Sequence, residues 1–339
     1  MNKTFAAVLR YFVFAGIAAG LLWYIFHGQD LGQLVESAKQ VDYYWILASM
    51  AVSLPGYVIR AKRWNLLLES LGYKTTLLNS SKAVGVGYFA NLAFPRLGEV
   101  LRCTVLNRTN KIPLNTLIGT VVAERTIDVI CLLILIVTVV TLRIETLGQY
   151  LITNFFNPMG EKIGKLASSP LFIGAAIIGI VLLIIGFRLL ITRTKFGARV
   201  KSFVADFTSG LLSVFRLKKI GQFLVLTFLM WTVYFGMMYV CFFGIPLVST
   251  LDIVDGLFLF VMGSIGMAAP TPGGTGTYHL AVVEGFKLIN LSAQQGLVLA
   301  TVFHLSQVAT TCIVGVTSVL TLPKKIISGQ ASNTKEQDI

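Results

Sequence analysis

Residues 114–142, LNTLIGTVVAERTIDVICLLILIVTVVTL, form a long apolar run that indicates the class of fold. It follows Pro113, ends before Arg143, and contains three charged residues that lie close together in its first half. A helix needs about 20 mainly apolar residues to cross the hydrocarbon of a bilayer. The stretch therefore predicts a membrane-spanning helix that is long enough to tilt or to extend into the cytoplasm.

The composition of the whole chain also indicates a membrane protein. Of its 339 residues, 55% are hydrophobic and 13% are charged, whereas soluble domains carry about 25% charged residues. This composition excludes a soluble globular enzyme, and the high apolar content excludes a disordered chain. We therefore predict an all-α polytopic membrane protein, with helices interrupted in places by some of the 31 Gly and 9 Pro residues.

Six apolar runs are predicted to span the membrane: residues 11–26, 43–59, 114–142, 171–191, 223–243 and 296–322. Arg60, Lys62, Arg63 and Trp64 follow the second run and are interpreted as its anchor in the headgroup layer. Two further regions, residues 77–106 and 253–288, are apolar but broken, and we interpret each as a re-entrant helical hairpin. Residues 1–325 then form one integral membrane domain, and residues 326–339 form a short cytoplasmic tail.

The distribution of positive charge predicts the orientation. With both termini in the cytoplasm and both hairpins re-entrant, most of the 28 Lys and Arg residues fall on the cytoplasmic side. This is the bias that cytoplasmic loops show in cell membranes, here the bacterial-type inner membrane. The net charge of +13 is then explained without a nucleic-acid partner.

The same topology contains a repeated pattern in two opposite orientations. An inward span, a hairpin from the cytoplasm and an outward span come first. An outward span, a hairpin from the outside and an inward span follow later in the chain. Inverted repeats with broken helices that meet near the midplane are typical of transporters.

The first broken region contains NLAFPRLGEVLR, residues 91–102. Pro95 and Gly98 permit a turn between two half-helices, and Asn91 lies just before this turn. Glu99 and Arg102 are three residues apart, so they share a helix face and can pair. We interpret Arg96 or Arg102 as the binding group for a lipid phosphate, with Glu99 orienting the guanidinium. The alternative is a cytoplasmic loop with a surface ion pair.

Three ionisable residues, Glu124, Arg125 and Asp128, lie within the third predicted span. Glu124 and Asp128 are four residues apart and share a helix face. Ionisable groups at this depth need partners or water, and we expect these three to pair with the cluster at residues 96–102. A headgroup site and a structural ion-pair network are equally compatible with this pattern.

The second broken region contains PTPGGTG, residues 270–276. The prolines would stop one half-helix, and the glycines allow a tight backbone turn. We interpret this segment as a re-entrant tip and place Thr271, Gly273, Gly274, Thr275 and the downstream Glu284 in the binding site. The alternative is a plain extracellular turn. The segment is not a phosphate-binding P-loop, because no Gly-Lys-Ser/Thr follows it.

These segments together resemble the lysylphosphatidylglycerol synthase transmembrane-region family over residues 5–325. The resemblance rests on RAKRW at 60–64, Asn91 with PRLGE at 95–99 and Arg102, Glu124-Arg125 with Asp128, and PTPGGTG at 270–276 with Glu284. It implies a flippase-like integral membrane protein. Two-part members also carry a soluble synthase domain, whereas only residues 324–339 follow the last predicted span here. The chain thus resembles the stand-alone members, and neither aminoacyl transfer nor a particular lipid is implied.

We therefore predict a lipid translocase that moves a phospholipid or glycolipid between leaflets, with a basic headgroup site between the two hairpins. Its expected partners are lipids with anionic or polar headgroups. The sequence has no ATP site, no zinc-ligand spacing and no Ser-His-Asp arrangement, so we expect no cofactor and no metal. One alternative is a lipid-modifying enzyme with Glu99, Glu124 or Asp128 as base. Another is a membrane subunit or scaffold that docks a separate synthase. A homo-oligomer stays open.

Overall fold

The computed structural model describes residues 31–144, 212–246, 248–249 and 251–323, together with residues 16, 19–24 and 27. Within these residues the chain is helical and forms no strand, which confirms the predicted all-helical fold. The predicted span at 171–191, and most of that at 11–26, lies outside the described residues. The helices are α2 (Leu31–Lys39), α3 (Tyr43–Ser70), α4 (Leu77–Ala93), α5 (Leu97–Asn110), α6 (Leu114–Leu142), η3 (Leu212–Arg216), α11 (Ile220–Phe242), α12 (Ile253–Ala268), η4 (Pro272–Gly274), α13 (Thr277–Leu288) and α14 (Ala293–Leu320).

Three of these helices, α6, α11 and α14, are apolar and long enough to cross a membrane. The shortest has 23 residues, which at about 1.5 Å per residue exceeds the roughly 30 Å of bilayer hydrocarbon. Their bounds lie within three residues of the runs predicted at 114–142, 223–243 and 296–322. The protein is therefore a multi-pass membrane protein.

Helix α3 differs from its prediction in an informative way. The predicted span ends at residue 59, but the helix continues to Ser70. Arg60, Arg63 and Trp64 are at most 2% exposed, so their side chains lie inside the protein and do not face a lipid surface. Their interpretation as anchors was wrong, because groups on neighbouring helices surround them. Lys62, on the opposite face, remains exposed.

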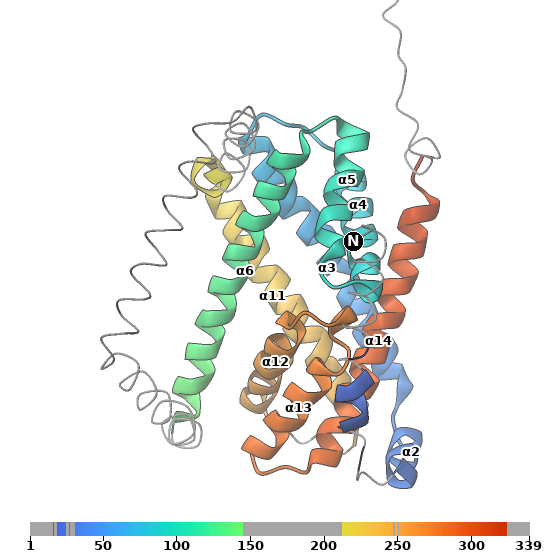
Figure 1. The fold of residues 1–339 in the computed structure, drawn as a ribbon. Coiled ribbons are helices and arrows are strands. Elements are labelled where there is room, and N and C mark those ends of the chain that lie inside the picture. The colour runs from blue at the N-terminus through green and yellow to red at the C-terminus, as the bar shows by residue number, and fades with distance from the viewer. Residues whose placement is uncertain are drawn as a thin grey trace, which may run out of the picture.

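The first broken region forms a helical hairpin of α4 and α5, joined at residues 94–96 (Figure 1). Arg96 ends the turn in a left-handed conformation, with φ of 61°. The two helices approach so closely that a Cβ atom on Gly98 would overlap the carbonyl oxygen of Gly87. The Gly98 N–H also donates to Asn91 Oδ1 at 2.7 Å, which ties the start of α5 to the end of α4.

The second broken region forms another helical hairpin, of α12 and α13, joined by residues 269–276. Gly273, Gly274 and Gly276 all have positive φ, which glycine adopts without a Cβ penalty. The hydroxyl groups of Thr271 and Thr277 lie 2.8 Å apart and join the two ends of the turn. The predicted break in the helix is thus present, and glycine makes its tight backbone path feasible.

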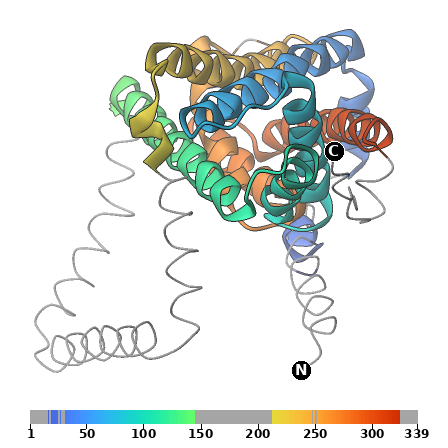
Figure 2. The ribbon, with the colours of Figure 1, turned by 90° about the horizontal axis from the view of Figure 1, so that it is seen from above.

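The two hairpins approach each other from opposite ends of the molecule (Figure 1). Their tips meet: a Cβ atom on Gly273 would lie 3.0 Å from the Leu92 side chain, at the end of α4. Helix α11 packs alongside α3, as the view from above shows (Figure 2). Helix α14 packs on both hairpins, and because Gly315 has no side chain, Phe89 of α4 packs closely against it.

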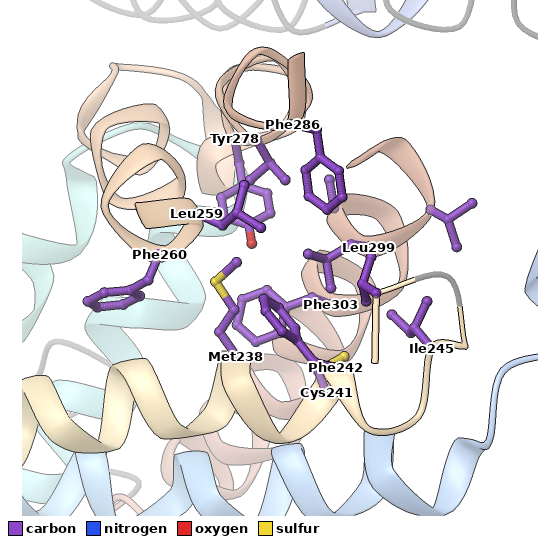
Figure 3. Packing of buried hydrophobic residues seen from close by; sticks show 14 of the residues in the cluster. Met238, Cys241, Phe242, Ile245, Leu259, Phe260, Tyr278, Phe286, Leu299 and Phe303 are labelled. Carbon is purple, nitrogen blue, oxygen red and sulfur yellow. The ribbon is translucent and has the colours of Figure 1, made fainter. Parts of the chain in front are cut away.

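The second hairpin rests on an apolar core that it shares with α11 and α14. Side chains from all four helices converge there (Figure 3), among them Met238, Phe242, Leu259, Phe260, Tyr278, Phe286, Leu299 and Phe303. A separate apolar cluster lies around α3, α4, α5 and α6. The buried Arg, Asp and Glu residues of the described part of the chain all lie on α3, α5 and α6, in this part of the molecule.

Candidate functional site

A cluster of buried charges lies where α3, α5 and α6 come together. Helix α3 contributes Arg60 and Arg63, one turn apart on its inner face, and α5 contributes Arg102. Helix α6 contributes Glu124 and Asp128, also one turn apart. All five residues are buried. Charges are rarely buried unless they are paired, so their contacts define the site.

Glu124 is the centre of this cluster and is fully buried. Its Oε1 accepts from Arg63 Nη2 at 2.9 Å and forms an ion pair with Arg60 Nη1 at 3.2 Å. Its Oε2 accepts from Arg102 Nη2 at 3.1 Å. One carboxylate of α6 therefore binds three guanidinium groups and ties α3 and α5 to α6.

Asp128 completes the pairing one turn further along α6. Its Oδ1 accepts from Arg63 Nη2 at 2.6 Å, and its Oδ2 accepts from Arg60 Nη2 at 3.1 Å. Arg125 Nη1 lies 3.6 Å from the same Oδ2. Both oxygens of Asp128 are thus occupied, as are both oxygens of Glu124.

Aromatic and hydroxyl groups enclose the α3 arginines. The Nε–H of Arg60 donates to Tyr234 Oη at 3.2 Å, and the Tyr234 hydroxyl lies 3.0 Å from that of Tyr88. Arg63 donates from Nη1 to the Thr227 hydroxyl at 3.3 Å. Because Tyr234 and Thr227 belong to α11, these bonds join that helix to the cluster.

Arg102 lies against an aromatic face. Its guanidinium carbon is 4.8 Å from the centroid of the Trp64 ring, a geometry in which the ring attracts the cation. The Trp64 indole N–H donates to Thr120 Oγ1 at 2.9 Å, so the ring is fixed between α3 and α6. The position of Arg102 is therefore set both by the ring and by Glu124.

A small cleft of about 10 Å³ adjoins this cluster, between α4, α5 and α6. At its rim Glu99 and Arg125 form an ion pair, with 3.5 Å between Glu99 Oε1 and Arg125 Nη2. Their side chains are 26% and 40% exposed, so this pair is more open than the buried cluster. The lining residues are Val84, Gly87, Tyr88, Asn91, Gly98, Glu99, Arg102 and Arg125.

Three polar atoms of the cleft-lining residues lack a hydrogen-bond partner among the described residues. They are the Nε–H groups of Arg102 and Arg125, which are donors, and Glu99 Oε2, which is an acceptor. All three atoms are buried. A buried polar atom without a partner is unfavourable.

The charges of the site do not balance. In the buried cluster three arginines face two carboxylates, and at the rim Glu99 and Arg125 cancel each other. One positive charge is therefore in excess, and Arg102 is the arginine of the buried cluster that lines the cleft. This arrangement suits an anion. Among the described residues, no group of three or more His, Cys, Asp or Glu side chains is placed to hold a metal ion.

Comparisons with known proteins place the chain in a family. The sequence profile described as "Lysylphosphatidylglycerol synthase TM region" matches residues 9–315. The chain belongs to this family. It is also 24% identical over 280 residues to the "UPF0104 membrane protein MJ1595" of Methanocaldococcus jannaschii, which covers 77% of this chain and 80% of that protein. No solved structure gave a match.

For this member of the lysylphosphatidylglycerol synthase transmembrane-region family, the structure changes one predicted pairing. Glu99 and Arg102 do not pair with each other: Glu99 binds Arg125, and Arg102 binds Glu124. The expected link between the two motifs, at residues 96–102 and 124–128, is confirmed. The reason is geometric, since α6 lies beside α5 and presents a buried carboxylate to Arg102.

The other predicted residues of the first hairpin occupy different environments. Asn91 lines the cleft, and its side-chain oxygen accepts from the Gly98 N–H. Arg96 is exposed at the hairpin tip and is not among the lining residues. The structure thus brings Asn91 to the cleft and leaves Arg96 outside it.

The predicted residues of the second hairpin lie apart from the cleft lining. Thr271, Gly273, Gly274 and Thr275 form the tip that meets Leu92. Glu284 is on α13 and pairs with Lys287, with 2.7 Å between its Oε1 and the Lys287 Nζ. The tip reaches the end of α4 next to Asn91, whereas Glu284 is part of a half-exposed pair.

Sequence reasoning missed five residues of the site: Arg60 and Arg63 within the cluster, and Trp64, Tyr88 and Tyr234 around it. A signal for the two arginines was present, because they are three residues apart and hence on one helix face. Two carboxylates within an apolar span also require buried cations. The tyrosines carried no such signal, since nothing in the sequence places α4 and α11 beside Arg60.

Proposed function

We propose that this protein is a membrane lipid translocase whose headgroup site is the cleft between α4, α5 and α6. The observation that carries the proposal is the excess positive charge of the buried cluster, which reaches the cleft at Arg102. A buried uncompensated charge is unfavourable, and an anionic ligand would compensate it. Within a membrane, a lipid phosphate is the abundant anion.

The surface next to the cleft supports an amphipathic ligand. Helix α6 continues from Arg125 with exposed apolar side chains at Val129, Ile130, Leu133 and Ile134. A headgroup in the cleft would place its acyl chains along this apolar surface. The charged cleft and the apolar helix face together match the two ends of a lipid.

The arrangement of the hairpins supports transport. In our proposal α4–α5 re-enters from the cytoplasm, α12–α13 re-enters from the outside, and both termini are cytoplasmic. The tips would then meet near the midplane, as in transporters with inverted repeats. Their contact between Gly273 and Leu92 supports this arrangement.

Leaflet exchange in liposomes tests the activity. The purified protein is reconstituted with lipids fluorescently labelled on an acyl chain, and a membrane-impermeant reductant quenches the outer leaflet. If the protein exchanges lipids between leaflets, the loss of fluorescence will exceed the fraction of label in the outer leaflet, and we expect this result. Arg102→Gln and Arg125→Gln should both slow the exchange. Glu69→Gln is the control, because Glu69 forms an exposed pair with Lys219 on the protein surface. Quenching limited to the outer leaflet for anionic, zwitterionic and sugar-bearing lipids would refute translocation by this chain.

Thiol labelling tests the orientation of the first hairpin. In a background without native cysteines, Arg96→Cys places a thiol at the exposed tip, and Lys39→Cys places one at the end of α2. We expect an impermeant reagent to reach position 96 from the cytoplasmic side and position 39 from the outside. Labelling of position 96 from the outside would refute the proposed inverted arrangement.

The geometry supports a lipid-modifying enzyme less well. Both oxygens of Glu124 and of Asp128 are occupied by arginines, so neither carboxylate presents a free oxygen to a substrate. Glu99 alone among the three predicted bases keeps an unpartnered oxygen. Lipid mass spectrometry of liposomes before and after incubation with the protein would detect a chemical change, which the translocase proposal does not predict.

A further inference from the structure

We infer that His279 and His304 form a proton-binding site, and that lipid movement by this protein is coupled to the binding and release of a proton there. The two imidazoles lie where α13 of the second hairpin packs on α14, and neither lines the charged cleft. The coupling rests on the proposed translocase function, whereas the proton site can be tested without it.

The two histidines form a close pair inside the protein. His279 is 4% exposed and His304 is 7% exposed. Their ring centroids are 4.9 Å apart, with the ring planes at 63°. The buried ring of Tyr278 completes the cluster, because it stacks on His304 at 5.7 Å and meets His279 edge-on at 6.0 Å. Two helices thus bring three titratable rings into one contact.

This cluster keeps polar atoms without a partner in an otherwise apolar core. His279 Nδ1 and the Tyr278 hydroxyl are buried and have no hydrogen-bond partner among the described residues. Figure 3 shows the Tyr278 hydroxyl pointing into the core, toward Met238 and Phe303. Unpartnered buried groups are unfavourable, and ionisable side chains within membrane proteins typically belong to proton or ion pathways.

The charged residues on the helices of the core pair elsewhere. On α13, Glu284 binds Lys287, and on α12, Asp255 binds Arg143. Helix α11 contributes Cys241 to the core that contains Tyr278, and this thiol carries no charge when protonated. A proton on the histidine pair would therefore have no carboxylate beside it among these helices.

The other helices that pack on α14 do not supply a charge to the pair either. On α2, Glu36 binds Lys39. The Tyr57 hydroxyl of α3 lies 3.0 Å from that of Thr311, and Lys82 of α4 donates to the Thr321 carbonyl at the far end of α14. Two imidazolium ions 4.9 Å apart would repel each other, so the pair holds one proton. The stacked Tyr278 ring attracts that proton to His304.

The position of the pair links proton binding to movement of the hairpin. His279 is the third residue of α13, directly after the glycine-rich tip, whereas His304 belongs to α14. In the structure the pair is dry, which favours neutral imidazoles. Withdrawal of the tip would separate the rings and admit water, which favours the protonated form. Proton binding and tip withdrawal therefore favour each other, by at most about tenfold per pH unit for one proton.

Liposomes with a gradient of about one pH unit test the coupling. They contain phosphatidylcholine with acyl-labelled phosphatidylglycerol, phosphatidylethanolamine or diglucosyldiacylglycerol, and potassium with valinomycin holds the membrane potential at zero. An impermeant reductant reads the leaflet distribution of the label, and liposomes without protein give the background. For at least one lipid we expect a leaflet ratio of about two- to tenfold that inverts when the gradient is reversed.

Variants assign the coupling to the histidine pair. His279→Gln/His304→Gln keeps polar side chains but cannot bind a proton in this pH range. It should still exchange lipids, but both leaflets should carry equal label despite the gradient. His27→Gln is the matched control, because His27 is exposed and stacks on Trp23, and it should behave as the wild type. Size-exclusion chromatography and exchange without a gradient monitor folding.

Nuclear magnetic resonance tests proton binding without transport. The chain has three histidines, so His27→Gln with carbon-13-labelled histidine in lipid nanodiscs shows only the signals of His279 and His304. We expect both signals to shift together between about pH 5 and 8, in one transition that corresponds to a single proton. Signals that stay unshifted over this range would overturn the proton site.

The remaining outcomes separate this inference from the proposed function. Exchange by the wild type that gives equal leaflets despite the gradient would overturn the coupling while leaving a translocase. A gradient-driven leaflet ratio that persists in His279→Gln/His304→Gln would remove the pair from the coupling. No exchange of any of the three lipids by the wild type would refute the translocase and the coupling together, and the resonance titration would still decide the proton site.

Discussion

Replacing Glu124 by Gln should destabilise the protein more than any other single change of charge in the cluster. Glu124 is fully buried and binds Arg60, Arg63 and Arg102 at 2.9–3.2 Å. The substitution keeps the shape of the side chain but doubles the excess positive charge, because three arginines then face Asp128 alone. Removing one partner of a buried ion pair typically costs about 3–5 kcal/mol of unfolding free energy.

Two matched variants show whether charge is the cause. Glu69→Gln removes a carboxylate from an exposed pair with Lys219 and should cost about 1 kcal/mol or less. The double variant Glu124→Gln/Arg102→Gln returns the buried charge to its original excess. It should therefore recover part of the stability that Glu124→Gln loses, although it has one more substitution.

Reversible unfolding in mixed detergent and dodecyl sulfate micelles, followed by circular dichroism, gives the free energies. The reasoning is refuted if Glu124→Gln and Glu69→Gln lose the same stability. It is refuted equally if the double variant is less stable than Glu124→Gln by the full cost of a second independent substitution. Either result would mean that the arginines do not depend on the Glu124 charge.

Three further substitutions test the packing around the site. Gly98→Ala should destabilise the first hairpin by about 2 kcal/mol or more, because its Cβ would overlap the facing backbone. Gly221→Ala is the control: its Cβ would meet open space, so the variant should be as stable as the wild type or more stable. Thermal unfolding compares the stability of the two variants. Tyr234→Phe should cost about 1–3 kcal/mol, because it leaves a buried arginine Nε–H without its acceptor, and unfolding titrations measure it. In the double variant Leu92→Cys/Gly273→Cys, a disulfide should form on oxidation and stop leaflet exchange, and reduction should restore the exchange. Exchange at the wild-type rate in the cross-linked protein would contradict transport by separation of the tips.

The long apolar helices could be predicted from the sequence because hydropathy alone determines them. The run at 114–142 begins after Pro113 and ends at Arg143, and α6 has the same bounds. Helix α3 was predicted too short, because the run of charges from residue 60 lowers the hydropathy. The helix nevertheless continues to Ser70, just before Gly72 with its positive φ. Charge ended the apolar pattern, but it did not end the helix.

The candidate site could be predicted only in part. Glu124 and Asp128 were detectable because carboxylates in an apolar span are costly without partners. Their partners were not, since Arg60 and Arg63 are more than fifty residues away and look like a membrane-surface anchor in the sequence. Which cation binds which carboxylate depends on how α3, α5 and α6 pack. This information becomes available only in three dimensions.

The two hairpins have similar shapes but unequal chemistry, and the proposed transport would use this difference. The first hairpin is tied to α6 by ion pairs near its tip, including that of Arg102 with Glu124. In the described part of α12–α13, ion pairs lie only at the ends far from the tip, where Asp255 binds Arg143 and Glu284 binds Lys287. An apolar core gives non-directional contacts that tolerate sliding, whereas a buried ion pair resists the separation of its partners. We therefore expect the glycine-rich tip of α12–α13 to move against a fixed charged cleft.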